Sequence, residues 1–254
     1  MTATLANTIS GAPGSPVVVM GSSLGTTQTM WEPQVAALAE HYRVIRYDHR
    51  GHGGSEMPPA PYRIADLGGD VIGLLDSLGV DRFSFVGLSL GGMTGMWVAS
   101  EIPQRVDRLA LLSTSAALGA PDAWYDRAAK VRAGGLAAVA HPVIARWFTP
   151  AYAAANPAII DEQIAGLLTV PVDGYAACCE AIAEMDLRDR LARINAPTVA
   201  IAATQDLAIP PVHSEAIVAA IAGARLELID HAAHIANIEQ PAAVTRLLLQ
   251  HLGE

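Results

Sequence analysis

The sequence predicts an α/β fold, in which a mostly parallel sheet carries helices on both faces and a helical cap is inserted between two strands. Short apolar runs bounded by turn residues recur along the chain, as buried strands do. Helical patterns lie between these runs, and such alternation is typical of a parallel sheet covered on both faces. From about residue 116 to residue 194 the alternation stops, because helical segments follow one another without a convincing strand.

The first half of the chain supplies three strands and two helices. Val17–Gly21 and Val44–Tyr47 are short apolar runs, and each is predicted to be a buried strand. Ile64–Leu78 is predicted to be a helix, because its apolar residues recur at helical spacing. The run Phe83–Gly87 is the third strand, and it leads directly into a helix over Gly91–Ile102.

The second half adds three strands around the cap. Leu109–Ser113 precedes the cap, and Val199–Ala203 and Leu226–Ile229 follow it. A C-terminal amphipathic helix is predicted from the spacing of Val244, Leu247, Leu248 and Leu252. We therefore expect residues 1–115 and 195–254 to form the core and residues 116–194 to form the cap.

Composition and charge narrow the class of protein. The 254 residues are 52% hydrophobic and 16% charged, which excludes an intrinsically disordered chain. The formal net charge of −9 disfavours nucleic acid and anionic membranes as partners. The N-terminus lacks a secretory pattern, no apolar run has the length of a membrane span, and Cys178 and Cys179 are adjacent rather than spaced like metal ligands. These features favour a cytoplasmic protein without a metal, and leave its oligomeric state open.

One motif carries chemistry. The third strand runs into Gly87-Leu-Ser-Leu-Gly91 and then into a helix, which is the context that the G-x-S-x-G motif requires. A sharp turn there strains Ser89 and lifts its hydroxyl clear of the sheet, while side chains at Gly87 and Gly91 would collide with the neighbouring strand and helix. The helix N-terminus favours a developing negative charge. We interpret Ser89 as a nucleophile; the alternative is a glycine-rich turn with a bystander serine.

A serine nucleophile needs a base and an acid that orients the base. Asp206 follows the strand Val199–Ala203, and His234 follows the next strand, so both stand where side chains leave the sheet. The chain order Ser89, Asp206, His234 is the order that this motif requires. The rival residues are His231 and Asp230 beside the base and Asp186 in the cap, for which loop or helix-capping roles are the simpler interpretation.

An oxyanion hole needs two N–H groups aimed at one point. One is expected from Leu90, the residue after the nucleophile. The other is expected from Leu24, in the loop after the first long strand. The glycine-rich segment Asp48–Ser55 follows the second long strand, and we interpret it as a structural turn with Asp48 and Arg50 in local hydrogen bonds.

Together these residues resemble the α/β-hydrolase superfamily over essentially the whole chain. Further stretches resemble the 3-oxoadipate enol-lactonases of the β-ketoadipate pathway: Ser23–Trp31, Arg146–Pro150, Gly174–Cys179, Asp186–Arg190 and Ala233–Pro241. The chain departs from that family's usual pattern at Ser22 and Gln205. The resemblance implies a serine hydrolase that opens the enol-lactone to 3-oxoadipate through an acyl-enzyme, without a metal or organic cofactor.

Two other functions remain open at this point. A general carboxylesterase or a perhydrolase-type relative would share the same triad and oxyanion hole and differ only in the cap. A noncatalytic ligand-binding receptor can retain a triad on this fold. In each case the expected partner is a small molecule, namely a lactone or ester substrate or a bound ligand.

The resemblance also implies an anionic substrate, because the enol-lactone carries a side-chain carboxylate. Burying this group unpaired would cost several kcal/mol, and an arginine fork matches a carboxylate with two hydrogen bonds. We expect Arg146 to bind this carboxylate and the ring of Trp147 to pack flat against the lactone. Arg132 is the second choice for binding the carboxylate. A structural ion pair for Arg146 and a core position for Trp147 are the alternative. The remaining cap cations are Arg127, Lys130, Arg188 and Arg190.

Overall fold

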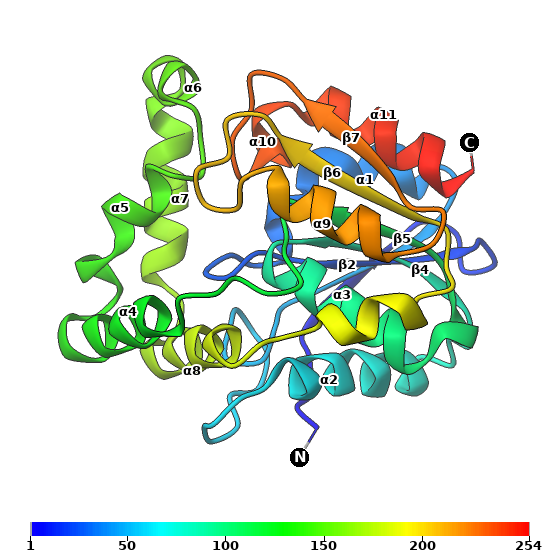
Figure 1. Cartoon of the computed structure of the whole chain (residues 1–254), viewed down its shortest axis with the longest axis horizontal. Helices are drawn as coiled ribbons and strands as arrows, with labels where there is room; N and C mark the ends of the chain where they lie inside the picture. Colours follow the sequence, from blue (N-terminus) through cyan, green and yellow to red (C-terminus); the bar gives the residue numbers. More distant parts are fainter. Residues whose placement is uncertain (1, 254) are drawn as a thin grey trace.

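Seven strands form one sheet, in the order β1-β3-β2-β4-β5-β6-β7 (Figure 1). In this computed structural model, which describes residues 2–253, neighbouring strands pair in parallel except that β1 is antiparallel to β3. The strands are β1 (Asn7–Ser10), β2 (Val17–Gly21), β3 (Arg43–Tyr47), β4 (Phe83–Leu88), β5 (Val106–Leu112), β6 (Thr198–Ala203) and β7 (Arg225–Ile229). Every residue of β4 and β6 is buried, as expected for strands inside a sheet that is covered on both faces.

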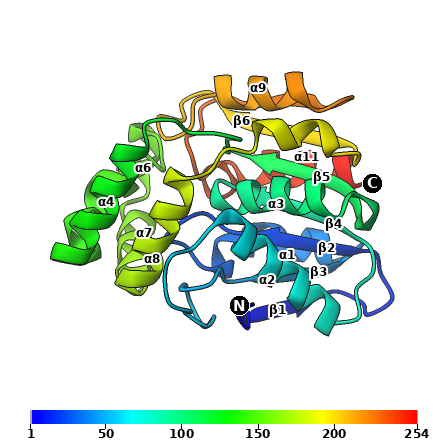
Figure 2. The same ribbon diagram turned by 60° about the horizontal axis from the view of Figure 1, so that its bottom comes forward.

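Helices cover both faces of the sheet, so the predicted fold class is confirmed. The helices α2 (Ile64–Ser77) and α3 (Leu90–Glu101) lie on one face, and α1 (Glu32–Ala39) and α11 (Pro241–Leu252) lie on the other (Figure 2). The helix α9 (Val212–Ala220) packs against β6 and β7. The short helices of this part are η1 (Gln28–Trp31), η2 (Pro103–Arg105) and α10 (Ala236–Glu239). Among residues 2–253, no helix combines the length and the apolar character that crossing a membrane requires.

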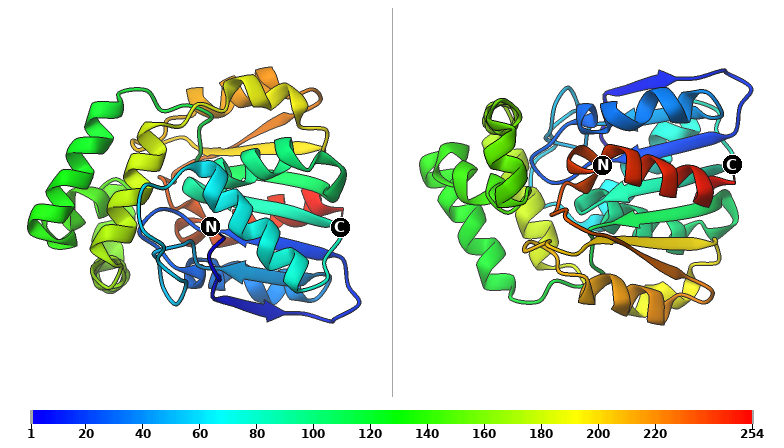
Figure 3. Two further views of the ribbon diagram at one scale, coloured as in Figure 1. Left: turned by 90° about the horizontal axis from the view of Figure 1, so that it is seen from below. Right: turned by 90° about the horizontal axis from the view of Figure 1, so that it is seen from above.

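The predicted helical insertion lies between β5 and β6. It consists of α4 (Pro121–Gly134), η3 (Leu136–Ala138), α5 (Ala140–Ile144), α6 (Pro150–Ala155), α7 (Pro157–Leu168), α8 (Val172–Ala183) and η4 (Arg188–Arg193). Both views of Figure 3 show the helices α4 to α8, in green to yellow-green, at one end of the sheet and opposite the C-terminus. We call α4 to α8 the cap helices; η4 instead contacts α3, beside the sheet. The division into a core and a cap at residues 116 and 194 stays a prediction.

Besides the short helices η1, η2 and α10, the sequence analysis did not predict β1, α1 and α9. The strand β1 has the sequence Asn-Thr-Ile-Ser and is largely exposed, because it pairs only with β3 at the edge of the sheet. Without a buried face it shows no apolar run. The helices α1 and α9 each bury only two side chains, so their apolar pattern is weak as well.

Candidate active site

Ser89 lies in a sharp turn between β4 and α3. Its backbone angles, φ 54° and ψ −114°, fall outside the regions that L-residues usually occupy. Hydrogen bonds hold this conformation, because the Ser89 N–H donates to the carbonyl of Leu112 at 2.9 Å and the Ser89 carbonyl accepts from Thr114 Oγ1 at 2.7 Å. The surrounding structure therefore fixes a strained serine, a feature that clusters at functional sites.

Glycines on both sides of Ser89 allow this turn. A Cβ atom at Gly87 would lie 2.3 Å from the carbonyl oxygen of Gly91, and one at Gly91 would lie 2.1 Å from the carbonyl oxygen of Gly21. Both contacts are with backbone atoms, which cannot move aside as a flexible side chain can. The motif thus requires glycine at both positions because three backbone segments meet there.

We expect Gly91→Ala to destabilise the fold by about 3 kcal/mol or more, since overpacking against backbone lies at the upper end of such costs. Urea unfolding followed by circular dichroism measures the change. Gly69→Ala is the matched control: Gly69 also lies in a helix, but a Cβ there meets nothing within 4 Å. Equal losses of stability in the two variants would contradict this account of the turn.

His234 and Asp206 form a buried pair. His234 Nδ1 donates to Asp206 Oδ2 at 2.8 Å, and the two side chains are 4% and 0% exposed. The other carboxylate oxygen, Oδ1, accepts from the backbone N–H groups of Ala208 at 2.7 Å and Ile209 at 2.9 Å. A carboxylate that only accepts places the histidine proton on Nδ1 and leaves Nε2 able to take a proton.

The loop that carries His234 is tied to the cap by Glu239. This buried carboxylate accepts from the N–H of Ala233 at 2.8 Å and from the N–H of Thr149 at 3.1 Å. The N–H of Ile235 donates to the carbonyl of Trp147 at 3.0 Å. Sequence analysis missed this role, although an acidic residue shortly after the histidine was its visible signal.

The rival acid and base residues lie elsewhere. His231 and Asp230 are exposed in the turn after β7, and His231 has a positive φ of 56°. Asp186 pairs with Arg188 next to η4, and this bond lowers the pKa of Asp186 to about 2. None of the three residues lines the cavity described below.

The two backbone N–H groups expected for an oxyanion hole belong to Leu90 and Leu24. Leu90 is the first residue of α3, and the N–H groups of the first helical turn have no acceptor within the helix. Leu24 lies in the loop after β2, where its N–H has no acceptor among residues 2–253, whereas Ser23, Gly25 and Thr26 each donate.

A cavity of about 300 Å³ lies under the cap helices. Ser89 and His234 line it together with Leu24. Its other walls are Ser23, Leu118, Gly119, Ala120, Ala123, Trp124, Arg127, Val143, Arg146, Trp147, Tyr175, Ile182, Ala208, Ile209 and His213. Such a volume suits a small organic molecule.

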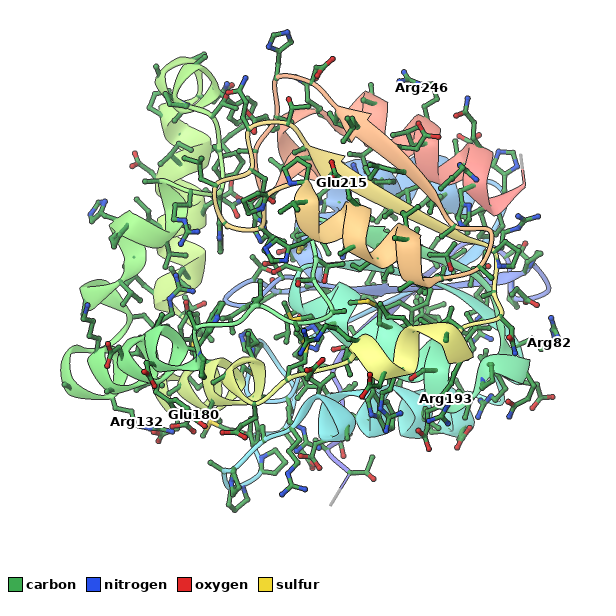
Figure 4. The ribbon with its side chains drawn as sticks, in the orientation of Figure 1. Arg82, Arg132, Glu180, Arg193, Glu215 and Arg246 are labelled. Carbon is green, nitrogen blue, oxygen red and sulfur yellow. The ribbon has the colours of Figure 1, made fainter. Side chains whose placement is uncertain are left out.

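The cap arginines divide between this cavity and the surface. Arg146 and Trp147 line the cavity, and the Arg146 guanidinium donates to the carbonyl of Leu207. Arg132 does not line it, because Arg132 forms an ion pair with Glu180 at the outer edge of α4 and α8 (Figure 4). Arg132, the second choice for binding the carboxylate, is therefore outside the cavity, because its side chain points along the outside of the cap.

Another arginine of α4 faces inward instead. Arg127 lines the cavity, and its guanidinium lies over the ring of Trp124, 4.9 Å from the ring centre. Sequence analysis named Arg127 only among the remaining cap cations. The spacing of Trp124 and Arg127, which places them on one face of the helix, was the signal for their pairing.

Residues 2–253 contain no cluster of histidine, cysteine, aspartate and glutamate side chains that could hold a metal ion. Cys178 and Cys179 are free and buried in α8. Burial raises the pKa of both thiols, to about 12 for Cys179.

Comparison with known proteins identifies relatives of the whole chain. It is 41% identical to 3-oxoadipate enol-lactonase 2 of Acinetobacter baylyi, over 92% of this chain and 87% of that protein. The enol-lactonase of Burkholderia xenovorans LB400 superposes with a TM-score of 0.96 at 43% identity, covering 98% of this chain and 96% of that one. A thermophilic esterase of Thermogutta terrifontis superposes with a TM-score of 0.91 at 30% identity, covering 98% and 92% of the two chains. Residues 11–150 and 164–241 match the alpha/beta hydrolase fold family, and the chain belongs to that family.

Proposed function

We propose that the protein is a serine hydrolase that opens 3-oxoadipate enol-lactone to 3-oxoadipate through an acyl-enzyme. The observation that carries the proposal is that the strained Ser89 and His234, which is bonded to Asp206, line the same cavity. The lactonase relatives, which match nearly the full length of the chain, support the choice of substrate.

In the first half of the reaction, Ser89 Oγ attacks the carbonyl carbon of the lactone ring while His234 Nε2 takes the hydroxyl proton. Asp206 keeps the imidazole in the required tautomer and stabilises the imidazolium that forms. The carbonyl oxygen becomes an oxyanion, which accepts hydrogen bonds from the N–H groups of Leu24 and Leu90. The ring C–O bond then breaks and leaves an acyl group on Ser89.

The leaving group is an enol rather than an alcohol. Its oxygen takes the proton from His234, and the enol then tautomerises to the ketone. An enol is a better leaving group than an alkoxide, so this step demands less of His234 as an acid. In the second half, His234 removes a proton from water and the resulting hydroxide attacks the acyl carbon. The bond between that carbon and Ser89 Oγ breaks, Ser89 Oγ takes the proton back from His234, and 3-oxoadipate is released.

The substrate carboxylate needs a cation in the cavity. Of the cap arginines, Arg127 and Arg146 line it, together with the apolar side chains of Trp124, Val143 and Trp147. Arg146 already donates to the carbonyl of Leu207, and this bond holds its guanidinium in place. The stacking of Arg127 on Trp124 fixes the plane of its guanidinium, as bidentate binding of a carboxylate requires. We therefore place Arg127 beside Arg146 as a carboxylate-binding residue.

We expect Arg127→Ala and Arg146→Ala each to raise KM for the carboxylated lactone by about 10- to 100-fold, the value of one charge-assisted hydrogen bond. Trp147→Ala should raise KM as well. Neither arginine change should much affect hydrolysis of the uncharged p-nitrophenyl acetate. Steady-state kinetics with both substrates measures the difference.

Arg132→Ala is the matched control, because Arg132 is a cation of the same helix, α4, outside the cavity. It should leave KM for both substrates unchanged. Equal losses on the charged and uncharged substrates would mean that Arg127 or Arg146 supports the cap and does not read the carboxylate.

The substrate itself is tested by comparing 3-oxoadipate enol-lactone with a neutral butenolide of similar size. The proposal expects a much higher kcat/KM for the carboxylated lactone. Similar values for the two compounds, with good turnover of simple esters, would favour a general carboxylesterase or perhydrolase-type enzyme. Binding without turnover of either compound would favour a receptor.

A further inference from the structure

The turn after β3 places two buried histidines behind the loop that carries Leu24. His49 and His52 belong to the glycine-rich segment Asp48–Ser55, and they are 1% and 0% exposed. Neither histidine lines the cavity that Ser89 lines, and neither takes part in the reaction described above. Their hydrogen bonds, however, run to that loop.

His52 accepts a hydrogen bond from the loop. The N–H of Gly25 donates to His52 Nε2 at 3.1 Å, while His52 Nδ1 donates to the carbonyl of Arg50 at 3.3 Å. These two bonds define one neutral tautomer, in which Nε2 carries the lone pair. Burial lowers the pKa of His52 to about 4, so the ring keeps this neutral form near neutral pH.

His49 holds the other side of the same loop. Its Nε2 donates to the carbonyl of Ser22 at 2.9 Å, and that carbonyl also accepts from the N–H of Gly91 at 2.9 Å. Leu24 therefore stands between two anchored residues, Ser22 and Gly25. Its own N–H stays without an acceptor among residues 2–253, as an oxyanion donor must.

The turn that supplies the histidines is itself rigid. Asp48 accepts from the N–H of Gln28 at 2.7 Å and from the N–H of Gly54 at 3.1 Å. Arg50 forms a buried ion pair with Asp70 of α2, at 2.6 Å. The turn that carries the acceptor of His52 is therefore tied to α2 through Arg50, independently of the bond to Gly25.

We propose that His52 is a positioning residue that holds the Leu24 N–H toward the developing oxyanion, through its hydrogen bond to Gly25. This inference rests on the proposed roles of Ser89 and Leu24, but not on the identity of the substrate. Loss of the acceptor would leave the Gly25 N–H buried and unpaired, and the loop would turn to satisfy it. The Leu24 N–H would then be displaced from the position where the oxyanion develops.

Two amide substitutions at His52 distinguish the loss of the acceptor for Gly25 from a change in side-chain size or polarity. In His52→Gln the side-chain oxygen reaches the position of Nε2 and can accept from Gly25. In His52→Asn the shorter amide can keep the contact with Arg50 but does not reach Gly25. We expect His52→Asn to lower kcat for p-nitrophenyl acetate and for the enol-lactone about 10- to 100-fold with KM nearly unchanged, somewhat less than the loss of a whole oxyanion donor. His52→Gln should recover kcat to within a few-fold of wild type.

Phenylboronic acid gives a second readout, because its adduct with a serine nucleophile places an oxygen in the oxyanion hole. Its inhibition constant should rise in His52→Asn by the same factor by which kcat falls, and should recover in His52→Gln. His251→Asn is the control for loss of a buried histidine, since His251 is 1% exposed in α11 and outside the cavity. It should lower the thermal midpoint without changing kcat or boronate affinity.

The proposal is overturned if His52→Asn lowers only the thermal midpoint, as His251→Asn is expected to do, while kcat and boronate affinity stay at wild-type values. Equal kinetic losses in the Asn and Gln variants would also overturn it, because the acceptor would then not matter. If wild-type protein binds no boronate and hydrolyses no ester, the proposed nucleophile has failed instead.

Discussion

Replacing Ser89 with alanine is expected to abolish hydrolysis, with a loss of kcat of about 10⁶-fold for a serine nucleophile that works with its base as one unit. The fold should stay intact, since the strained turn is held by the Ser89 N–H, which donates to the Leu112 carbonyl, and by the Ser89 carbonyl, which accepts from Thr114 Oγ1; neither bond involves the Ser89 hydroxyl. Alanine keeps Cβ and lacks only Oγ, so the substitution adds no atom to a residue with a positive φ of 54°.

Steady-state assays with the enol-lactone and with p-nitrophenyl acetate measure the loss, and thermal unfolding confirms that the variant is folded. Retention of more than about a tenth of wild-type activity, in protein purified free of other esterases, would remove Ser89 from the role of nucleophile. Boronate titration of the variant should show no binding, because the adduct needs the serine oxygen.

The core of the fold was predictable because its parallel strands are buried on both faces. Such strands appear in the sequence as continuous apolar runs, and β2, β4 and β6 lie where these runs predicted them. β1 lacks this signal, because its polar residues pair only at the sheet edge. β5 starts at Val106, three residues earlier than predicted. The prediction missed its first residues because Asp107 and Arg108 are polar and partly exposed.

The positions of Ser89, Asp206 and His234 could be predicted because each follows a buried strand, and the carboxyl ends of parallel strands meet at one edge of the sheet. The cap could not be resolved in the same way. Helical periodicity does not tell which face of α4 turns inward, so Arg132, which pairs with Glu180, was preferred over Arg127. The direction of α4 is set by its packing against α8, a contact between segments distant in sequence.

The residues that hold the loops in place were missed for a related reason. His52 and Glu239 accept hydrogen bonds from the backbone N–H groups of Gly25 and Thr149, which lie far away in the chain. The sequence shows a histidine in a glycine-rich turn and an acid after the base, but not their acceptors and donors. Only the tertiary structure supplies the partner, so the function of such residues is visible in it alone.

The second large effect is expected for Asp206→Asn, which should lower kcat about 10⁴-fold with KM much less affected. Oδ1 of Asp206 accepts from the N–H groups of Ala208 and Ile209, and that position requires an oxygen. The amide introduced by the substitution must therefore direct its NH₂ group at His234 Nδ1. Because NH₂ only donates, Nδ1 must become the acceptor and the ring proton must move to Nε2. His234 then cannot take the proton of Ser89.

Asp230→Asn is the matched comparison, because Asp230 is also an aspartate close to His234 in sequence but is exposed in the turn after β7. It should change kcat less than about twofold, the usual range for a surface substitution away from the site. Neither substitution changes the oxyanion hole. Phenylboronic acid should therefore bind both variants in nearly the wild-type geometry, while kcat differs between them. If Asp230→Asn were the slower enzyme in a side-by-side measurement, the orienting acid would be Asp230, and the 2.8 Å bond between His234 and Asp206 would serve only the loop.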